Sequence, residues 1–163
     1  MIPLVLSACI GSSQAKDSFA LPLRIEASLE GSNALFTADI FEGGCDITFE
    51  GGHALEGTKL CFRTDGNSAT VGDILTRDIK NGTFPAQEAL IKAIRLLATT
   101  EISGVAVDNG TRYTIDEMTI IVYHGENTDL PTGIETEEHG RRFEFSIASL
   151  EPYEAEDNSV HSP

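Results

Sequence analysis

The side chains in this sequence best suited to bind metals or take part in catalysis are its three cysteines and four histidines. Cysteines and histidines at short spacing can hold zinc, and either residue beside a suitable partner can support nucleophilic catalysis. The sequence contains no Cys-x-x-Cys pair, and its histidines stand in turns, at a strand end and near the last residue. His139 follows Glu137 and Glu138, but three consecutive residues rarely converge on one ion. We therefore expect no metal site, no cofactor and no enzymatic reaction.

Cys9 stands between an apolar run and a small polar stretch. Residues 1–8 read MIPLVLSA, and Gly11-Ser12-Ser13-Gln14 follows the cysteine. Leu6-Ser7-Ala8-Cys9 resembles the lipobox of bacterial lipoproteins, in which the cysteine sulfur carries diacylglycerol. No Lys or Arg precedes Cys9, whereas a secretory signal begins with positive charge. We interpret residues 1–8 as the remnant of a truncated lipoprotein signal and residues 9–18 as a tether.

This resemblance implies that Cys9 is the lipid attachment site and that the protein is anchored, outside the cytoplasm, at a bacterial cell envelope. The alternative is an ordinary cysteine in a frayed end. No stretch of 18 or more apolar residues follows, so that anchoring would depend on the lipid alone.

The composition is that of one acidic globular domain. The 163 residues are 40% hydrophobic and carry a formal charge of −15. Nucleic-acid binding requires clustered Lys and Arg, so that the charge argues against such a partner. The longest basic run, Arg141-Arg142, is flanked by glutamates and is typical of a charge-balanced hairpin end.

Alternation of apolar and polar residues predicts mostly β structure. Strands are expected over 23–29, 34–41, 45–49, 60–62, 69–71, 105–107, 113–115, 118–123, 134–138 and 143–147. The segment 118–123 is apolar on both faces, which favours a central position in the sheet. The first strands are joined by short glycine-containing turns, which predicts an antiparallel meander.

One segment is convincingly helical, from Pro85 to Ala98. Apolar residues recur there at spacings of three and four, with polar residues opposite. Thr83 is the expected cap, and Glu88 with Lys92 is the expected i,i+4 ion pair. Many strands with one helix give an α+β fold.

Cys45 and Cys61 are expected to point to opposite faces of neighbouring strands. Cys45 alternates with Ile47 and Phe49, whereas Cys61 lies between the apolar residues Leu60 and Phe62. A disulfide is conceivable in an exported protein, but diverging side chains cannot be bridged. Buried or half-buried free thiols are the simpler interpretation.

The order of strands, helix and returning strands resembles the lipoprotein-carrier (LolA/LolB-like) superfamily over about residues 20–150. The segments that carry this resemblance are His53-Ala54-Leu55-Glu56-Gly57, Phe84-Pro85-Ala86 and Thr128-Asp129-Leu130-Pro131. The resemblance implies a curved antiparallel sheet, an incomplete barrel, packed on one main helix, with an apolar ligand on its concave face. We place this single domain at 19–150 and interpret residues 151–163 as an acidic disordered tail.

Apolar residues on the predicted strands and helix are the candidates for such a ligand site or for the core. They are Phe36, Ile40, Phe49, Phe62, Leu90, Ile94, Leu97, Ile120, Phe143 and Phe145. They either pack the sheet against the helix or line a cavity for a lipid or acyl group. The sequence thus favours a non-enzymatic, lipid-anchored envelope lipoprotein. The alternative is a structural or signalling module that binds another envelope protein through its surface, without a cavity.

Overall fold

The computed structural model describes residues 19–32, 34–51, 53–126, 128 and 130–154. The predicted signal remnant, the tether with Cys9, and the tail from residue 155 onward lie outside the described residues.

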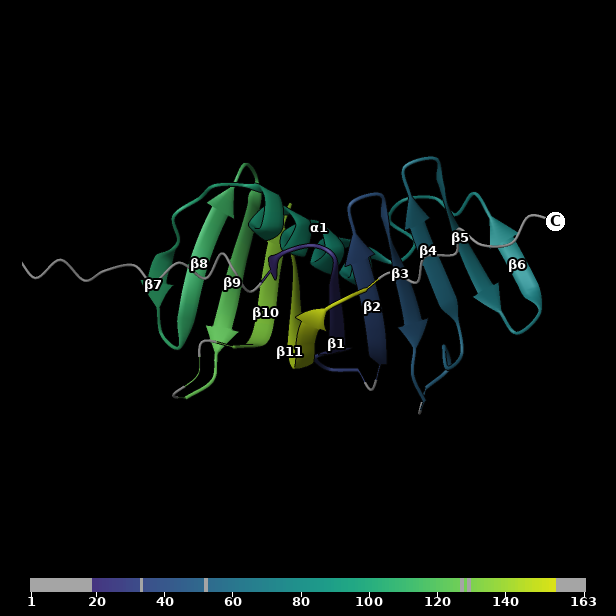
Figure 1. Ribbon diagram of the computed structural model, residues 1–163, viewed down its shortest axis with the longest axis horizontal. Coiled ribbons are helices and arrows are strands. Elements are labelled where there is room, and N and C mark those ends of the chain that lie inside the picture. Colours follow the sequence, from purple (N-terminus) through teal and green to yellow (C-terminus); the bar gives the residue numbers. More distant parts are fainter. Residues whose placement is uncertain (1–18, 33, 52, 127, 129, 155–163) are drawn as a thin grey trace, which may run out of the picture.

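The described residues form one sheet of eleven strands and one helix (Figure 1). In chain order the elements are β1 (Leu23–Leu29), β2 (Leu35–Phe41), β3 (Gly44–Phe49), β4 (Lys59–Arg63), β5 (Gly66–Val71), β6 (Ile74–Arg77), α1 (Pro85–Thr99), β7 (Val105–Val107), β8 (Gly110–Ile115), β9 (Met118–His124), β10 (Pro131–Glu138) and β11 (Arg141–Pro152).

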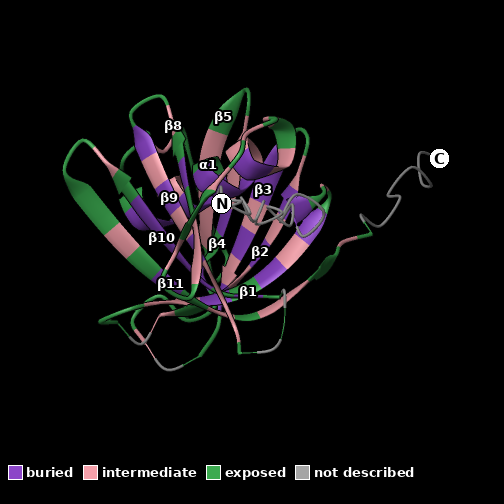
Figure 2. Ribbon diagram, turned by 90° about the vertical axis from the view of Figure 1, so that its left-hand side faces the viewer, coloured by how far each residue is buried: buried purple, intermediate pink, exposed green. Residues whose placement is uncertain are grey.

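The sheet consists of two antiparallel meanders joined at its centre. The strand order is β6-β5-β4-β3-β2-β1-β11-β10-β9-β8-β7, so that the first and last strands pair in the middle. Strands β6 and β7 lie at opposite edges, and the segment between them must therefore cross the whole sheet. Figure 2 shows the result, a curved open sheet with α1 on its concave side.

The core lies between α1 and the concave face of the sheet. Phe36, Phe49 and Phe145 are each at most 1% exposed, and Phe36 packs at a tilt against Phe49 and edge to face against Phe145. The ring centroids of Phe36 and Phe49 are 5.9 Å apart, and those of Phe36 and Phe145 are 6.3 Å apart. Such tilted aromatic pairs add about 1 kcal/mol each to the energy of burial. The expected α+β architecture, a curved sheet on one main helix, is confirmed.

The start of α1 is stabilised differently from the sequence prediction. Phe84 is the N-cap residue and makes no side-chain cap, while the Thr83 hydroxyl donates to the Lys80 carbonyl oxygen. The Glu88 carboxylate instead accepts the amide N–H of Gly82 at 2.7 Å and that of Phe84 at 3.3 Å. The predicted Thr83 cap is wrong, because the longer Glu88 side chain reaches the free amides that precede the helix.

The expected pairing of Glu88 with Lys92 is also wrong. The Lys92 ammonium forms an ion pair with Glu138 at the end of β10, and the Glu88 carboxylate is occupied by backbone amides. Tertiary partners thus replace the weak helix-surface pair.

Three strand predictions need correction. Strand β6 was not expected, because all four of its residues are exposed and give no alternation. Strand β9 lies third from the β7 edge rather than centrally, since its second face is half-buried and not fully buried. Strand β11 continues to Pro152, past the expected domain end at residue 150. The next residue, Tyr153, also packs on the domain, because the Arg24 guanidinium lies 4.9 Å from its ring centroid.

Both described cysteines are free thiols on opposite faces of the sheet, as predicted. Cys45 is opposite Phe62 and is buried, whereas Cys61 is opposite Asp46 and is half-buried. Within the described part of the chain, no helix is both long and apolar enough to cross a membrane.

Candidate ligand-binding groove

Most of the apolar candidate residues are buried in the core, and two of them are partly exposed at the surface. Eight of the ten are at most 6% exposed and pack between the sheet and α1; they are Phe36, Ile40, Phe49, Leu90, Ile94, Leu97, Ile120 and Phe145. Phe62 and Phe143 are half-buried, and each lines a depression at the surface. The depressions lie beside α1, one against β4 and β5 and the other against the β10–β11 hairpin.

The larger depression is a groove of about 370 Å³ between α1 and strands β4 and β5. Its apolar surface comes from Phe62 of β4 and from Ile91 and Leu96 of α1. The remaining lining residues are polar or charged: Arg63, Thr64, Asn67, Asn81, Glu88, Lys92, Arg95 and Thr99. The groove thus combines an apolar wall with hydrogen-bonding groups, as small-molecule sites commonly do.

The groove exists because of the position of two elements. Strand β4 places Phe62 on the same face as the buried Leu60, and the α1 periodicity turns Ile91 toward the sheet. The loop after β6 closes one side, where the Asn67 amide donates to the Asn81 side-chain oxygen at 2.8 Å. Sequence periodicity predicted the individual apolar faces, but the space between them depends on how α1 crosses the sheet.

Two of the three cations at the groove are already engaged. The Arg63 guanidinium donates to the carbonyl oxygens of Cys45 and Phe62, both at 3.0 Å, and lies 2.5 Å from an Asp46 carboxylate oxygen. Lys92 forms its ion pair with Glu138. These contacts hold both side chains in place and partly neutralise them.

Arg95 differs from the other two because one of its donors is buried without a partner. Its Nη2 atom donates to the Phe41 carbonyl oxygen at 3.2 Å, while its buried Nε atom has no hydrogen-bond partner within the structure described. A guanidinium fixed at one end and unsatisfied at another suits a carboxylate or phosphate oxygen. Sequence reasoning placed Arg95 on the polar face of the helix and gave no sign of this role.

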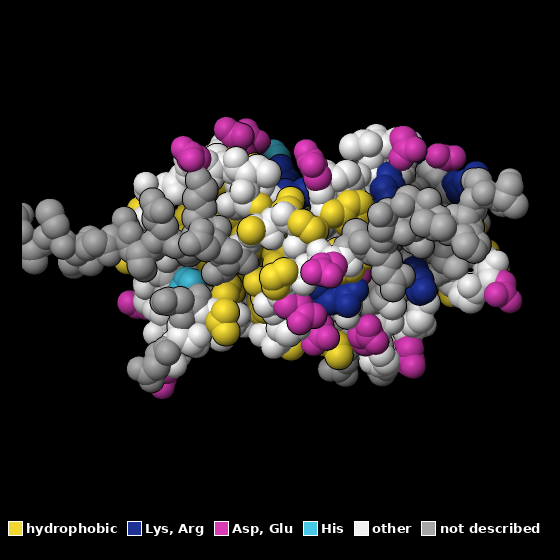
Figure 3. Space-filling view, in the orientation of Figure 1, with side chains coloured by type: hydrophobic (Ala, Val, Ile, Leu, Met, Phe, Trp, Pro, Cys, Tyr) yellow, Lys and Arg dark blue, Asp and Glu magenta, His cyan; other side chains and the backbone are white. Residues whose placement is uncertain are grey.

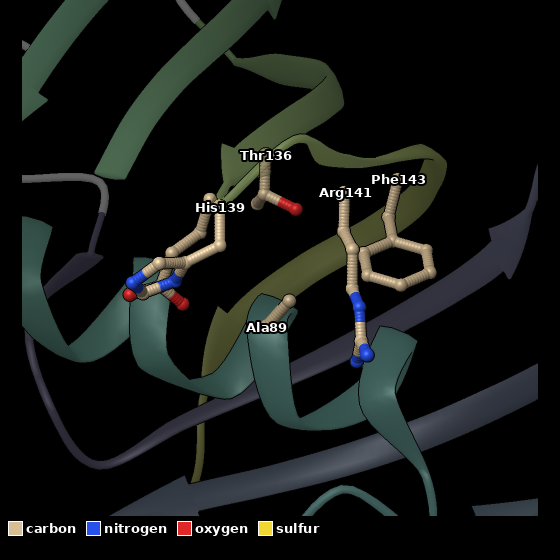
Figure 4. A pocket seen from close by; sticks show the side chains of 6 residues that line it. Ala89, Thr136, His139, Arg141 and Phe143 are labelled. Atoms are coloured by element: carbon tan, nitrogen blue, oxygen red, sulfur yellow. The ribbon is translucent and has the colours of Figure 1, made fainter. Parts of the chain in front are cut away.

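The smaller depression, of about 130 Å³, lies between α1 and the β10–β11 hairpin. It is lined by Ala89, Thr136, Glu138, His139, Arg141 and Phe143. Figure 4 shows Thr136 pointing into the space beside Arg141 and Phe143, above Ala89 of α1. Thr136 was also missed in the sequence, because its register with the buried Ile120 and the half-buried Phe143 is known only from the structure.

The two adjacent arginines of the hairpin have different environments. Arg142 lies on the convex face, where its Nη2 atom is 2.8 Å from a carboxylate oxygen of Glu135, a residue only 6% exposed. The Tyr123 hydroxyl donates to the same oxygen at 2.9 Å, and burial together with this bond raises the pKa of Tyr123. No partner is found for Arg141 among the described residues. The predicted charge-balanced hairpin end thus holds for Arg142 and not for Arg141.

One face of the molecule carries a band of hydrophobic side chains across its middle (Figure 3). Asp and Glu lie along the upper edge of this face and also beside Lys and Arg just below the band. In the described ranges no three His, Cys, Asp or Glu side chains gather in a group that could hold a metal ion. The His139 Nε2 atom instead lies 2.7 Å from Glu117 in the turn between β8 and β9.

Comparison with known proteins supports the expected fold. No protein-family model and no curated protein match the sequence. The structure is similar to the crystal structure of a LolA superfamily protein from Nitrosomonas europaea, with a TM-score of 0.52 and 10% sequence identity. The match covers 91% of this chain and 94% of that chain. This chain has a LolA-like fold. The LolA-like resemblance expected from the sequence is thereby confirmed, and it extends over nearly the whole chain.

The LolA-like fold explains why the site lies where it does. A sheet that curves without closing has a concave face (Figure 2), and the two depressions lie on either side of the helix that crosses it. At such low identity the likeness concerns the arrangement of the elements and not the chemistry of the groove.

Proposed function

We propose that this chain is a non-enzymatic, lipid-anchored protein of the bacterial cell envelope that binds a lipid or acyl group. The observation that carries the proposal is the groove of about 370 Å³ along α1, with Phe62, Ile91 and Leu96 as its apolar wall. Ligand pockets in proteins commonly measure about 300–1,000 Å³ and are lined mainly by apolar side chains. The groove therefore has room for part of an acyl chain.

The charge at the groove favours an amphipathic ligand with an anionic head. The Arg95 guanidinium has an unsatisfied buried Nε atom, and Arg63 and Lys92 stand beside it. Arg63 and Lys92 are paired with Asp46 and Glu138, so that Arg95 is the cation at the groove that is not in an ion pair within the structure described. The acyl chain would lie against Phe62 and Leu96, and its carboxylate or phosphate would face Arg95.

The anchor proposed at Cys9 would keep the groove near membranes. Two acyl chains on one cysteine give stable anchoring, whereas a single chain binds membranes weakly and reversibly. The acidic domain would be repelled by anionic lipid and so stand away from the surface. Intact mass and membrane partition of the full chain, beside a Cys9→Ala variant, test this part. Equal partition and unmodified mass for both would remove the anchor from the proposal.

Displacement of a fluorescent fatty acid tests the groove. Leu96→Ser removes an apolar wall, and Leu130→Ser removes the same side chain from an exposed site, 62% exposed, that does not line the groove. We expect the Leu96 variant to bind about tenfold more weakly, at a loss of about 1–2 kcal/mol of buried apolar contact. The Leu130 variant should bind like the unmodified chain. Equal binding by both variants, with circular dichroism unchanged, would rule out the groove as the site.

A second candidate function uses the edge of the sheet to bind another envelope protein. Strand β6 pairs with β5 on one side, and its residues Ile74 and Leu75 are 71% and 52% exposed. Such an edge can accept a further strand. If this is the function, Ile74→Lys with Leu75→Lys abolishes complex formation with the partner and leaves fatty-acid binding unchanged.

A further inference from the structure

We infer that the pocket between α1 and the β10–β11 hairpin is a separate site for a short-chain carboxylate. The pocket of about 130 Å³ lies on the side of α1 that faces β10 and β11. It has room for several water molecules and therefore for a ligand the size of propionate. The inference concerns different side chains from those that form the groove and does not depend on it.

Thr136 provides the main indication that this pocket can bind a hydrogen-bonding ligand. Its side-chain oxygen is buried, the residue is 1% exposed, and no hydrogen-bond partner is present within the described structure. A buried hydroxyl without a partner costs about 1–3 kcal/mol, so that native proteins seldom leave one in that state. A hydroxyl can donate to a carboxylate oxygen, which would satisfy it.

Arg141 gives the pocket its charge preference. Figure 4 shows its side chain reaching from β11 toward α1 across the opening. The guanidinium has no ion-pair or hydrogen-bond partner among the described residues, unlike that of Arg142, which binds Glu135. A planar guanidinium favours carboxylates because it can donate two parallel hydrogen bonds.

The other charged groups at the pocket do not oppose an anion. Glu138 is partly neutralised by its ion pair with Lys92, and the His139 Nε2 atom lies 2.7 Å from Glu117. Phe143 supplies an apolar wall, which a carboxylate with a short alkyl chain can use and inorganic phosphate cannot. The small side chain of Ala89 forms the helix side of the pocket, and it is what leaves the space open.

The test is an NMR titration of the full chain with sodium propionate at constant ionic strength, with propionamide and inorganic phosphate as competing probes. We expect saturable shifts around Thr136 and Phe143 with propionate, and much weaker binding of propionamide and phosphate. Shifts that fail to saturate would overturn the inference, as would tighter binding of phosphate or equal binding of propionamide.

Three variants and a control assign the site. Arg141→Gln should weaken propionate binding about tenfold, because hydrogen bonds to charged groups contribute at least that factor. Thr136→Val should weaken it by several fold, and Ala89→Leu should abolish it by filling the pocket. Arg112→Gln removes one positive charge from the opposite face, at a position in register with Ile121, and should leave binding unchanged. Unchanged affinity in both the Arg141 and Thr136 variants would place propionate elsewhere and refute the inference.

Discussion

Thr136 illustrates how one side chain can cost stability for the sake of a site. The hydroxyl is buried without a partner, and its neighbours in the sheet are otherwise apolar on the same face. Valine has nearly the same shape and lacks the unsatisfied group.

We therefore expect Thr136→Val to raise the free energy of unfolding by about 1 kcal/mol in urea titrations. Thr119→Val on β9, a half-buried site opposite Glu137, is the control and should change stability by less than about 0.5 kcal/mol. A loss of stability in the Thr136 variant would mean that its hydroxyl has a partner in solution.

Cys45 makes the protein sensitive to alkaline pH. Burial raises the pKa of Cys45 far above its ordinary value of 9.0 and, together with Asp46, raises that of Cys61 to a smaller degree. A raised folded pKa means that the stability contribution is complete below pH 9.0 and is lost progressively as the pH rises above it.

The free energy of unfolding should thus fall above this pH by up to about 1.4 kcal/mol per pH unit for Cys45. Cys45→Ala should flatten the decline, and Cys61→Ala should flatten it less. Parallel curves for the unmodified chain and the Cys45 variant would contradict this assignment.

At the scale of elements, the start of α1 depends on the Glu88 carboxylate. This side chain belongs to the helix and reaches back to the residues just before it. Glu88 accepts the amide N–H groups of Gly82 and Phe84, which would otherwise lack partners at the helix start. A negative charge at this end is also favoured by the helix dipole.

Glu88→Gln should lower the free energy of unfolding by about 1 kcal/mol, as measured by thermal or urea unfolding. Glu126→Gln removes the same charge from an exposed loop position and should have little effect. A loss of the same size in both variants would point to net charge and not to the helix cap.

The sequence patterns predicted the positions of the helix and most strands better than the contacts between segments far apart in the chain. Strands such as β1 and β2 were evident because each has one buried face, whereas the fully exposed β6 had no pattern to detect. The apolar faces behind the groove were likewise predictable. Its volume, the free Nε atom of Arg95 and the orphan hydroxyl of Thr136 were not, because each depends on contacts between segments far apart in the chain.

At the scale of the whole molecule, the charge of −15 opposes the compact state. Screening by salt shortens the range of this repulsion from about 10 Å at 0.1 M to about 3 Å at 1 M.

We expect the melting temperature to rise by about 4 °C over that interval, as for a gain of about 1 kcal/mol in a domain of this size. Sodium and potassium chloride should act alike if screening is the cause. A melting temperature that falls with salt would show that the ion pairs, such as Arg142 with Glu135, outweigh the repulsion.

The pairing of β1 with β11 at the centre of the sheet has a consequence for synthesis on the ribosome. Strand β1 is the first strand of the sheet to be translated, but its partner β11, over Arg141–Pro152, is translated after all the other strands described. Until then the β1 edge is open, and the two halves of the sheet cannot join. A nascent chain halted before Arg141 would expose a long strand edge of the kind that aggregates. Chaperone demand should therefore be greatest late in translation, just before the final strand is released.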